Sequence, residues 1–489
     1  MQKLGFAWRI YFIALILRLI PVLLAHSLGI GLDDMFQYDM LARSLASGNG
    51  FRWYAGEDLQ RLEKYVEFDL SHIDYDPARG VPTSFRAPLY PVFLAAIYFL
   101  TGGGTGRFFA TRLVQAGLNA LLAPLTYLVS RRLFPGNEPA SVISAWIVTC
   151  YPLLIIYPIG LATENLFFLL VLASFYFLLK IPKSQISNPD SHSHFSTFYA
   201  LLSGLFLSLA ILTRSVILPF AGLIVLWTWF ILGRKRAAIF IALTMLFLVS
   251  PWVIRNSILH QKLAGVESSM GYNLYVGYHP DGNGSFVYGP SIDLLTILDD
   301  AQRDQLGTQR AMEFICAEPE RVLPLTLNRL GFFFGLENRA LMYLYSNNFL
   351  GYISPAILLA IAGVLLLPFV IVVPSAILGL SLVRPHASVI LFYLLLFAYI
   401  LPHVLILSED RFHLTIIPFL AILAAQAWTG GRSAIVNRWR ESLAGKVAIS
   451  IGILVVILLF VNWGFELSLD ADKIAALLGP NGNRTYFPY

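Results

Sequence analysis

Charged residues are scarce in this sequence: they make up 13% of the 489 positions, whereas hydrophobic residues make up 57%. A soluble domain carries about a quarter charged residues, so the composition excludes an ordinary soluble enzyme. Cysteine is scarce as well, with 2 in the chain. Cys150 lies in an apolar run and Cys316 in a polar segment, which gives neither a disulfide framework nor a metal-ligand spacing. No internal repeat is visible, which counts against a transporter built from two related halves.

Long apolar runs are what the sequence has instead. Runs of roughly 17–25 residues, the length that crosses a ~30 Å hydrocarbon core, recur along most of the chain. We therefore predict an all-α polytopic membrane protein with about 11 transmembrane helices, in a range of about 11–13. The predicted spans lie near residues 10–30, 108–130, 141–158, 164–180, 198–213, 215–233, 237–255, 352–382, 387–407, 413–428 and 447–464.

The segment 88–101 is apolar but short, and charge bias decides how to interpret it. If it lies in the membrane interface, the basic clusters at 131–132, 180–183, 234–236 and 432–446 all fall on one side. The positive-inside rule favours this layout. We therefore expect a cytoplasmic N-terminus, an outer C-terminal tail and a juxtamembrane helix at 88–101. Since the basic residues lie in short loops, the formal charge of +5 reflects topology, and we expect no nucleic-acid partner.

Two adjacent carboxylates, Asp33 and Asp34, lie just after the first apolar run. Charges at the mouth of a membrane helix are costly, so they suggest a functional site. On a helix over 34–48, Asp34, Tyr38 and Leu41 share one face, and Gly48 ends the helix. The alternative is that both carboxylates are solvated first-turn residues, stabilised by the helix dipole.

A second acidic candidate is Glu164, which heads an apolar run and would emerge on the same membrane side as Asp34. The alternative is an ordinary first-turn carboxylate, preceded by a Thr163 cap. Arginines also fall at this outer surface, against the usual charge bias, and together they suggest a phosphate-bearing ligand. Pairing with local carboxylates or snorkelling to lipid phosphates remains the alternative. These arginines are Arg86, Arg214, Arg255, Arg339 and Arg411.

Two further patterns fall on the outer side. Tyr272 and Asn273 lie in a segment suited to stacking on a sugar and hydrogen bonding to it, although an interfacial aromatic belt explains it equally well. His403, Glu409 and His413 do not have a strong metal-ligand spacing, so ordinary polar contacts are the favoured interpretation.

An ordered series of motifs resembles the GT-C glycosyltransferases, and most closely the groups related to protein O-mannosyltransferases and lipid A aminoarabinose transferases. The stretch Asp34-Met35-Phe36-Gln37-Tyr38 is similar to their first outer loop, and Phe85-Arg86-Ala87-Pro88 is similar to the segment that ends this loop. Thr163-Glu164-Asn165 resembles their second acidic site. Further matches, in the family's order over residues 10–430, are Leu212-Thr213-Arg214, Pro251-Trp252-Val253-Ile254-Arg255, Gly271-Tyr272-Asn273 and Asp410-Arg411-Phe412-His413.

The resemblance implies transfer of a sugar from a polyprenyl-phosphate-linked donor to an acceptor hydroxyl, with inversion, outside the cytoplasmic (inner) membrane. It implies that Asp34 is the general base, with Asp33 as the close alternative, and that Glu164 orients the acceptor or balances a cation. The implied partners are the lipid donor, a glycan, lipid or protein acceptor, and membrane lipids. The substrate or phosphate contacts would be Tyr38, Arg86, Arg214, Arg255, Tyr272, Asn273, Arg411 and His413.

The resemblance leaves the cofactor unknown. The aminoarabinose transferases have a metal-associated glutamate where this chain places Arg86, so assistance by a divalent metal or by arginine both stay open. We expect an N-terminal catalytic transmembrane module at 1–255 that includes the outer loop 31–107. An outer loop region at 256–351, C-terminal transmembrane helices at 352–464 and an outer tail at 465–489 would follow. A membrane transporter or lipid flippase without chemistry is the alternative function.

Overall fold

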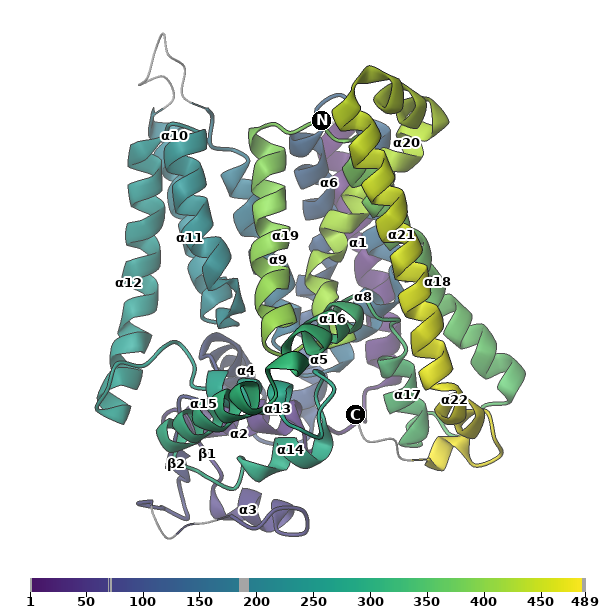
Figure 1. Ribbon diagram of the computed structural model, residues 1–489. Coiled ribbons are helices and arrows are strands. Elements are labelled where there is room, and N and C mark those ends of the chain that lie inside the picture. The colour runs from purple at the N-terminus through teal and green to yellow at the C-terminus, as the bar shows by residue number, and fades with distance from the viewer. Residues whose placement is uncertain (1, 69, 71–72, 184–192, 486–489) are drawn as a thin grey trace.

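The computed structural model describes residues 2–68, 70, 73–183 and 193–485. These residues fold almost entirely as helices (Figure 1). Two short strands, β1 (Arg52–Trp53) and β2 (Val81–Pro82), pair antiparallel, with Arg52 opposite Pro82. The predicted all-α polytopic architecture is therefore confirmed.

The helical bundle is built from two stretches of the chain. The N-terminal stretch contributes α1 (Gln2–Leu24), α5 (Gly106–Ala120), α6 (Leu122–Leu133), α7 (Glu138–Cys150), α8 (Pro152–Ile156), η1 (Tyr157–Ile159), α9 (Glu164–Leu178), α10 (Ser193–Ile211), η2 (Ser215–Ile217), α11 (Leu218–Leu226), η3 (Trp227–Ile231) and α12 (Lys235–His260). The C-terminal stretch contributes α18 (Pro355–Leu382), α19 (Ala387–Leu405), η5 (Asp410–Ile416), α20 (Ile417–Glu441) and α21 (Leu443–Leu469).

Shorter helices gather at the lower end of the bundle in Figure 1. They are α2 (Asp34–Ala46), α3 (Gly56–Leu62), α4 (Leu89–Thr101), α13 (Met270–Tyr278), α14 (Tyr288–Asp293), α15 (Asp300–Ala317), α16 (Val322–Phe333), α17 (Arg339–Ser346) and α22 (Ala471–Leu477). The single turns η4 (Pro319–Arg321) and η6 (Gly482–Arg484) accompany them in sequence. A second apolar core, separate from that of the bundle, packs Phe36, Trp53, Phe85 and Tyr272 together and so joins α2, β1 and α13.

Judged by length and composition, the candidate membrane spans are fewer than the predicted eleven. Within the described residues, 8 helices are long and apolar enough to cross a membrane, or up to 9 if the bent pair α7–α8 is one span. The remaining two predicted spans, α9 and the 215–231 segment, are helical but shorter, so the count of eleven is not confirmed. The run at 352–382 forms one helix rather than two. At 13 residues, or about 20 Å, α4 is too short to cross, as predicted for 88–101.

The bend between α7 and α8, which measures 55°, has an identifiable cause. Pro152 has no N–H, so the carbonyl of Val148, four residues earlier, loses its helical donor. The buried Arg18 of α1 supplies one instead: its Nη2 donates to the Val148 oxygen at 3.1 Å, and its Nη1 lies 3.5 Å from the Thr149 oxygen. An arginine inside a predicted span therefore has a structural partner.

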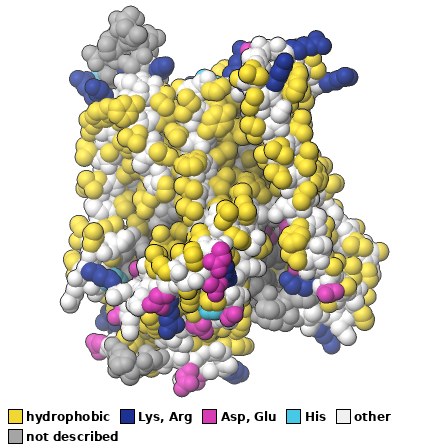
Figure 2. Space-filling model, viewed as in Figure 1, with side chains coloured by type: hydrophobic (Ala, Val, Ile, Leu, Met, Phe, Trp, Pro, Cys, Tyr) yellow, Lys and Arg dark blue, Asp and Glu magenta, His cyan; other side chains and the backbone are white. Residues whose placement is uncertain are grey.

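The two ends of the bundle differ in charge. Figure 2 shows lysine and arginine side chains gathered at the upper end, whereas acidic side chains lie mainly in the lower part. The chain begins at the upper end and finishes in the lower part (Figure 1), as an odd number of crossings requires. Both features agree with the predicted layout, in which the lower end is the outer one.

Candidate active site

The two adjacent carboxylates have different roles. Asp33 is the N-cap of α2, and its carboxylate accepts a hydrogen bond from the backbone nitrogen of Met35 at 2.9 Å. Asp34 begins the helix and faces two guanidinium groups: its Oδ1 pairs with Arg86, and its Oδ2 lies 3.3 Å from Nη2 of Arg411. Its side chain is 39% exposed. Asp33 thus caps the helix, whereas Asp34, in the first turn, is the ion-paired group.

Arg86 is held against α2 by several contacts. Its Nε and Nη2 donate to the side-chain oxygen of Gln37 at 2.9 Å and 2.6 Å. Its guanidinium also lies 5.2 Å from the centre of the Tyr38 ring, which favours the cation. Because Asp34, Gln37 and Tyr38 come from two turns of one helix, the orientation of the arginine is fixed relative to Asp34.

The backbone before Arg86 is fixed from a distant part of the chain. Thr83 Oγ1 and the Ser84 backbone nitrogen both donate to Oδ2 of the buried Asp300, each at 2.6 Å. Asp300 is the first residue of α15 and pairs with Arg303 at 3.1 Å. The placement of Arg86 therefore depends on α15 as well as on α2.

Arg411 lies in η5 and joins two carboxylates. Its Nε is 2.7 Å from Oε2 of Glu409, which is buried, while its Nη2 reaches Asp34. Glu409, two residues before Arg411 in the sequence, thus orients the Arg411 guanidinium toward Asp34 of α2, which lies more than 370 positions earlier.

Glu164 forms a second acidic position beside the first. It is 4% exposed and pairs with Nη1 of Arg214. Thr163 occupies the N-cap position of α9, but its hydroxyl donates to Glu164 Oε2 at 3.1 Å instead of capping the helix, so the capping prediction is wrong. The Arg214 guanidinium lies 5.2 Å from the Phe412 ring, the neighbour of Arg411. The two acidic positions are thereby linked through η5.

The turn that carries Glu164 is held by a buried polar network. Gln115 Nε2 donates to the Pro158 and Gly160 oxygens at 3.0 and 3.1 Å, and Asn165 Nδ2 donates to Gly160 at 3.0 Å. The Tyr90 hydroxyl donates to Gln115 at 2.7 Å. Since buried polar groups must be paired to be tolerated, this network ties the turn to α5 and α4.

The result is a cluster of alternating charges at the lower end of the bundle. Its members come from α2, the end of the first outer loop, the start of α9, the junction before η2, and η5. We call this the charged cluster, and it consists of Asp34, Glu164, Glu409, Arg86, Arg214 and Arg411.

The cluster shifts the pKa of the groups that face it. Desolvation alone would raise the pKa of Asp34, but the charges of Arg86 and Arg411 hold it well below the usual range. Desolvation, together with the negative charge of Asp34, raises the pKa of Asp33. Burial raises the pKa of Tyr38 to about 12, so this phenol is a neutral hydrogen-bonding group at neutral pH.

Three of the predicted contacts lie outside the charged cluster. The Tyr272 hydroxyl donates to the Ser291 oxygen at 2.9 Å, and its ring packs edge-on against Phe85, 5.5 Å away. Asn273 is half-buried in α13. Arg255 donates to the Thr83 oxygen at 2.5 Å and lies over the Trp252 ring. Tyr272 and Arg255 thus brace the segment that carries Arg86, which favours a structural role for both.

His413 faces the protein interior. Its Nδ1 lies 2.7 Å from the Phe333 oxygen, and its Nε2 lies 2.9 Å from Oε1 of Glu337. The same Glu337 oxygen accepts a hydrogen bond from the Tyr151 hydroxyl at 2.6 Å, and all three side chains are buried. With both ring nitrogens engaged, His413 anchors η5 in the bundle, which favours a structural role over the binding of phosphate.

Three residues of the site were not among the sequence candidates. Gln37 lies inside the motif that was recognised, and its position one helical turn after Asp34 is the signal that could have found it. Glu409 was considered only in a weak metal-ligand spacing and as a local partner of arginine. Glu337 carried no signal, because nothing in its segment relates it to His413, 76 residues away.

The donor set at Asp34 does not fit a divalent metal. Both carboxylate oxygens are engaged by guanidinium groups, whose positive charge would repel a cation. Glu164 and Glu409 are likewise paired with arginines. Nowhere in the described part of the chain do three His, Cys, Asp or Glu side chains form a group that could hold a metal ion. The arrangement suits an anion bound by arginine.

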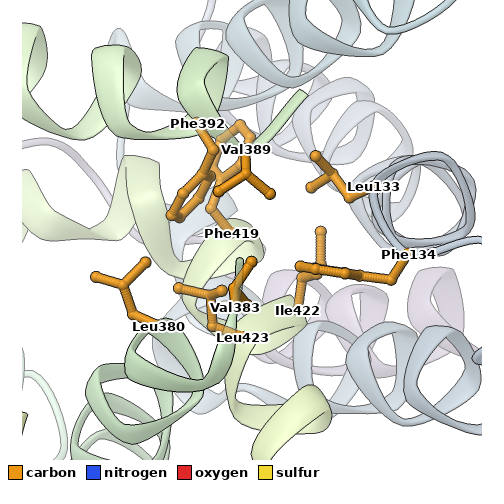
Figure 3. Close-up of a pocket in the computed structure, with 9 residues that line it drawn as sticks. All are labelled: Leu133, Phe134, Leu380, Val383, Val389, Phe392, Phe419, Ile422 and Leu423. Carbon is orange, nitrogen blue, oxygen red and sulfur yellow. The ribbon is translucent and has the colours of Figure 1, made fainter. Parts of the chain in front are cut away.

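A small apolar cavity lies between α6, α18, α19 and α20 (Figure 3). Its volume is about 10 Å³, which is room for about one water molecule, and every lining side chain is apolar. It therefore offers nothing to a substrate. The residues that line it are Leu133, Phe134, Leu380, Val383, Val389, Phe392, Phe419, Ile422 and Leu423.

The fold and this cluster define a multi-pass membrane protein with an arginine and carboxylate site at one end of its bundle. No family model matches the chain, and no curated protein matches it. Among solved structures, it is similar to the Archaeoglobus fulgidus oligosaccharyltransferase tethered with an acceptor peptide, with a TM-score of 0.49 and 13% identity. The match covers 100% of this chain and 59% of the other, so the chain spans less than two thirds of that enzyme.

The chain is also similar to ArnT from Cupriavidus metallidurans. The structure bound to undecaprenyl phosphate matches with a TM-score of 0.39 and 12% identity, over 89% of this chain and 80% of the other. The apo structure matches with a TM-score of 0.38 and 12% identity, over 90% and 80%. These enzymes are of the GT-C class that the sequence motifs resemble. At these TM-scores the likeness concerns the general course of the chain and carries no argument about activity.

Proposed function

We propose that this protein transfers a sugar from a polyprenyl-phosphate-linked donor to an acceptor hydroxyl, with inversion, at the outer face of the membrane. The observation that supports this is the charged cluster, in which an accessible carboxylate, Asp34, lies between two arginines. A lipid-anchored donor requires a site at the membrane surface, and α2, which carries Asp34, lies at the lower end of the bundle (Figure 1), where most acidic side chains in Figure 2 lie. The order of the motifs along the sequence gives independent support.

In the proposed reaction the acceptor oxygen attacks the anomeric carbon from the face opposite the phosphate. The bond from that carbon to the phosphate oxygen breaks, its electron pair stays on the phosphate, and the acceptor proton passes to Asp34. A positioned carboxylate can act as this base. The single displacement inverts the configuration at the anomeric carbon.

The arginines would stabilise the leaving phosphate. Guanidinium groups bind phosphate through charge-assisted hydrogen bonds, and such groups favour a transition state in which negative charge develops. Arg86 and Arg411 are placed for this, since each already faces an anionic oxygen of Asp34. Their supporting contacts, to Gln37 and to Glu409 at 2.7 Å, do not depend on Asp34.

The same arginines make Asp34 a weak base before the donor binds, because they lower its pKa. A bound phosphate would compete for Arg86 and Arg411. As their contacts pass from the carboxylate to the phosphate, the pKa of Asp34 rises and its basicity increases. The base would thus be strengthened when the donor is in place.

Glu164 has a supporting part in this proposal. Because it is 4% exposed and paired with Arg214, an acceptor has little access to it. We propose that it balances the charge of Arg214 and keeps that guanidinium beside η5. The resemblance implied that Glu164 either orients the acceptor or balances a cation, and this proposal takes the second role.

The test compares a deletion strain with its complemented parent by mass spectrometry of membrane lipids and envelope glycans. Loss of one defined sugar from a glycan, lipid or protein, with accumulation of the matching polyprenyl-phosphate sugar, is the expected result. Purified protein in liposomes should then convert this donor. Counterflow of the donor across the liposome membrane without any chemical change would contradict the proposal and favour a transporter.

A further inference from the structure

A second, larger cavity lies within the first outer loop, between residues 40 and 79. Its volume is about 300 Å³, at the lower end of the range for small-molecule sites. It is lined by the second half of α2, the turn that follows, β1, the start of α3 and the segment 77–79. One continuous stretch of chain therefore builds it.

This cavity is separate from the charged cluster. On α2 it is lined by Met40, Arg43 and Ser44, whereas Asp34 and Tyr38 lie on a different face of the helix. Arg43 follows Asp34 by nine positions, which is about 14 Å along the helix axis. A small ligand in the cavity would not touch the reacting atoms at Asp34.

Two arginines, Arg52 and Arg79, give the cavity wall a positive charge that Glu57, also in the wall, offsets only in part. Arg52 donates from Nε and Nη2 to the Gly80 oxygen at 3.2 and 3.0 Å, and Arg79 donates to the Asn49 oxygen at 3.4 Å. Neither forms an ion pair with another residue that the structure describes. Arg43 differs, because Asp39 and Asp58 neutralise it at 2.8 and 2.7 Å.

Further polar groups, one of them a carboxylate, complete the lining. Ser44 and Asn49 contribute a hydroxyl and an amide, and Glu57 contributes a carboxylate. Trp53 also lines the cavity; it is 1% exposed, and its indole nitrogen is buried without a hydrogen-bond partner in the described structure. The wall therefore combines hydroxyl, amide and carboxylate groups with a net positive charge.

We propose that this cavity binds a sugar that carries a carboxylate or phosphate group, and that it holds a distal unit of the acceptor glycan. Sugar hydroxyls both donate and accept, which suits the mixed polar wall, and the anionic group suits Arg52 and Arg79. The binding of an anionic sugar stands on the cavity alone. Its assignment to the acceptor rests on the proposed function.

The experiment measures binding to the purified full-length protein by titration calorimetry, without donor lipid. The probes are glucuronate and glucose 6-phosphate, with glucose and inorganic phosphate as comparisons. We expect at least one charged sugar to bind more tightly than both comparisons. Arg79→Gln should weaken that binding by about tenfold, the effect of one charge-assisted hydrogen bond. Arg61→Gln is the matched control, because Arg61 is an exposed arginine of the same loop that does not line the cavity.

Each alternative outcome overturns a stated part of the proposal. No saturable binding of either charged sugar, or equal weakening by Arg61→Gln, would exclude an anionic-sugar site. Equally tight binding of inorganic phosphate would reduce it to an anion site. Asp34→Asn should leave binding of the sugar unchanged. A parent protein that binds the sugar but transfers nothing would contradict the proposed function and leave this site in place.

Discussion

Asp34→Asn is the most informative substitution, because it removes the proposed base and changes little else. A general base contributes about 10²- to 10⁴-fold to a rate, which corresponds to about 3–5 kcal/mol of transition-state stabilisation. We therefore expect sugar transfer by the purified Asn variant to fall by at least 100-fold. The assay is conversion of the polyprenyl-phosphate sugar in liposomes.

Such a loss would not come from unfolding. Asp34 is 39% and Arg411 36% exposed, and an exposed ion pair contributes only about 0–1 kcal/mol. Arg86 would keep Gln37, and Arg411 would keep Glu409 at 2.7 Å. The thermal unfolding midpoint of the variant should therefore stay close to that of the parent protein.

Asp33→Asn is the matched control. Asparagine caps a helix about as well as aspartate, so the backbone nitrogen of Met35 would keep its acceptor and transfer should continue at nearly the parent rate. Full activity of Asp34→Asn would refute the assignment of the base. Full activity of Asp34→Asn together with loss of activity in Asp33→Asn would move the base to Asp33.

Three further predictions concern the groups around the site. Arg86→Gln removes a charge that lowers the pKa of Asp34, so this pKa should rise. The acidic limb of the rate–pH profile should then move to higher pH. A limb that does not move would exclude Asp34 as the titrating group. Glu337→Ala leaves His413 and a tyrosine without their buried acceptor, and should destabilise the protein by about 2–5 kcal/mol in thermal unfolding. Arg18→Met frees the carbonyls at the α7 bend and should cost about 1–3 kcal/mol by the same measurement.

The sequence was most informative where local rules act. The apolar runs predicted the helical membrane bundle, and the short run at 88–101 forms a helix of 13 residues, below the length of the candidate spans. The first helix of the outer loop was expected over 34–48 and is observed at Asp34–Ala46. The span count could not be decided in this way, because α9 and the 215–231 segment are too short to be classified by length alone.

The pairing within the charged cluster could not be derived from local patterns. The separation between Asp34 and Arg411 is 377 positions, and Arg86 is placed by Asp300, which lies more than 200 positions further on. Motif order suggested that some of these residues share a site, but not which cation faces which carboxylate. Arg255 shows the consequence: charge and topology placed it with the phosphate contacts, whereas it donates to the backbone of Thr83.

The two arginines also show why the cofactor stayed open at the sequence level. The sequence resemblance allowed assistance either by a metal or by arginine, since this chain places Arg86 where the aminoarabinose transferases have a metal-associated glutamate. The contacts favour the anion, because both oxygens of Asp34 already face guanidinium groups. A phosphate can displace a carboxylate from an arginine by exchanging one anion for another, whereas a metal would have to displace two cations. Asp34 is therefore placed to exchange its partners with a phosphate rather than to bind a metal.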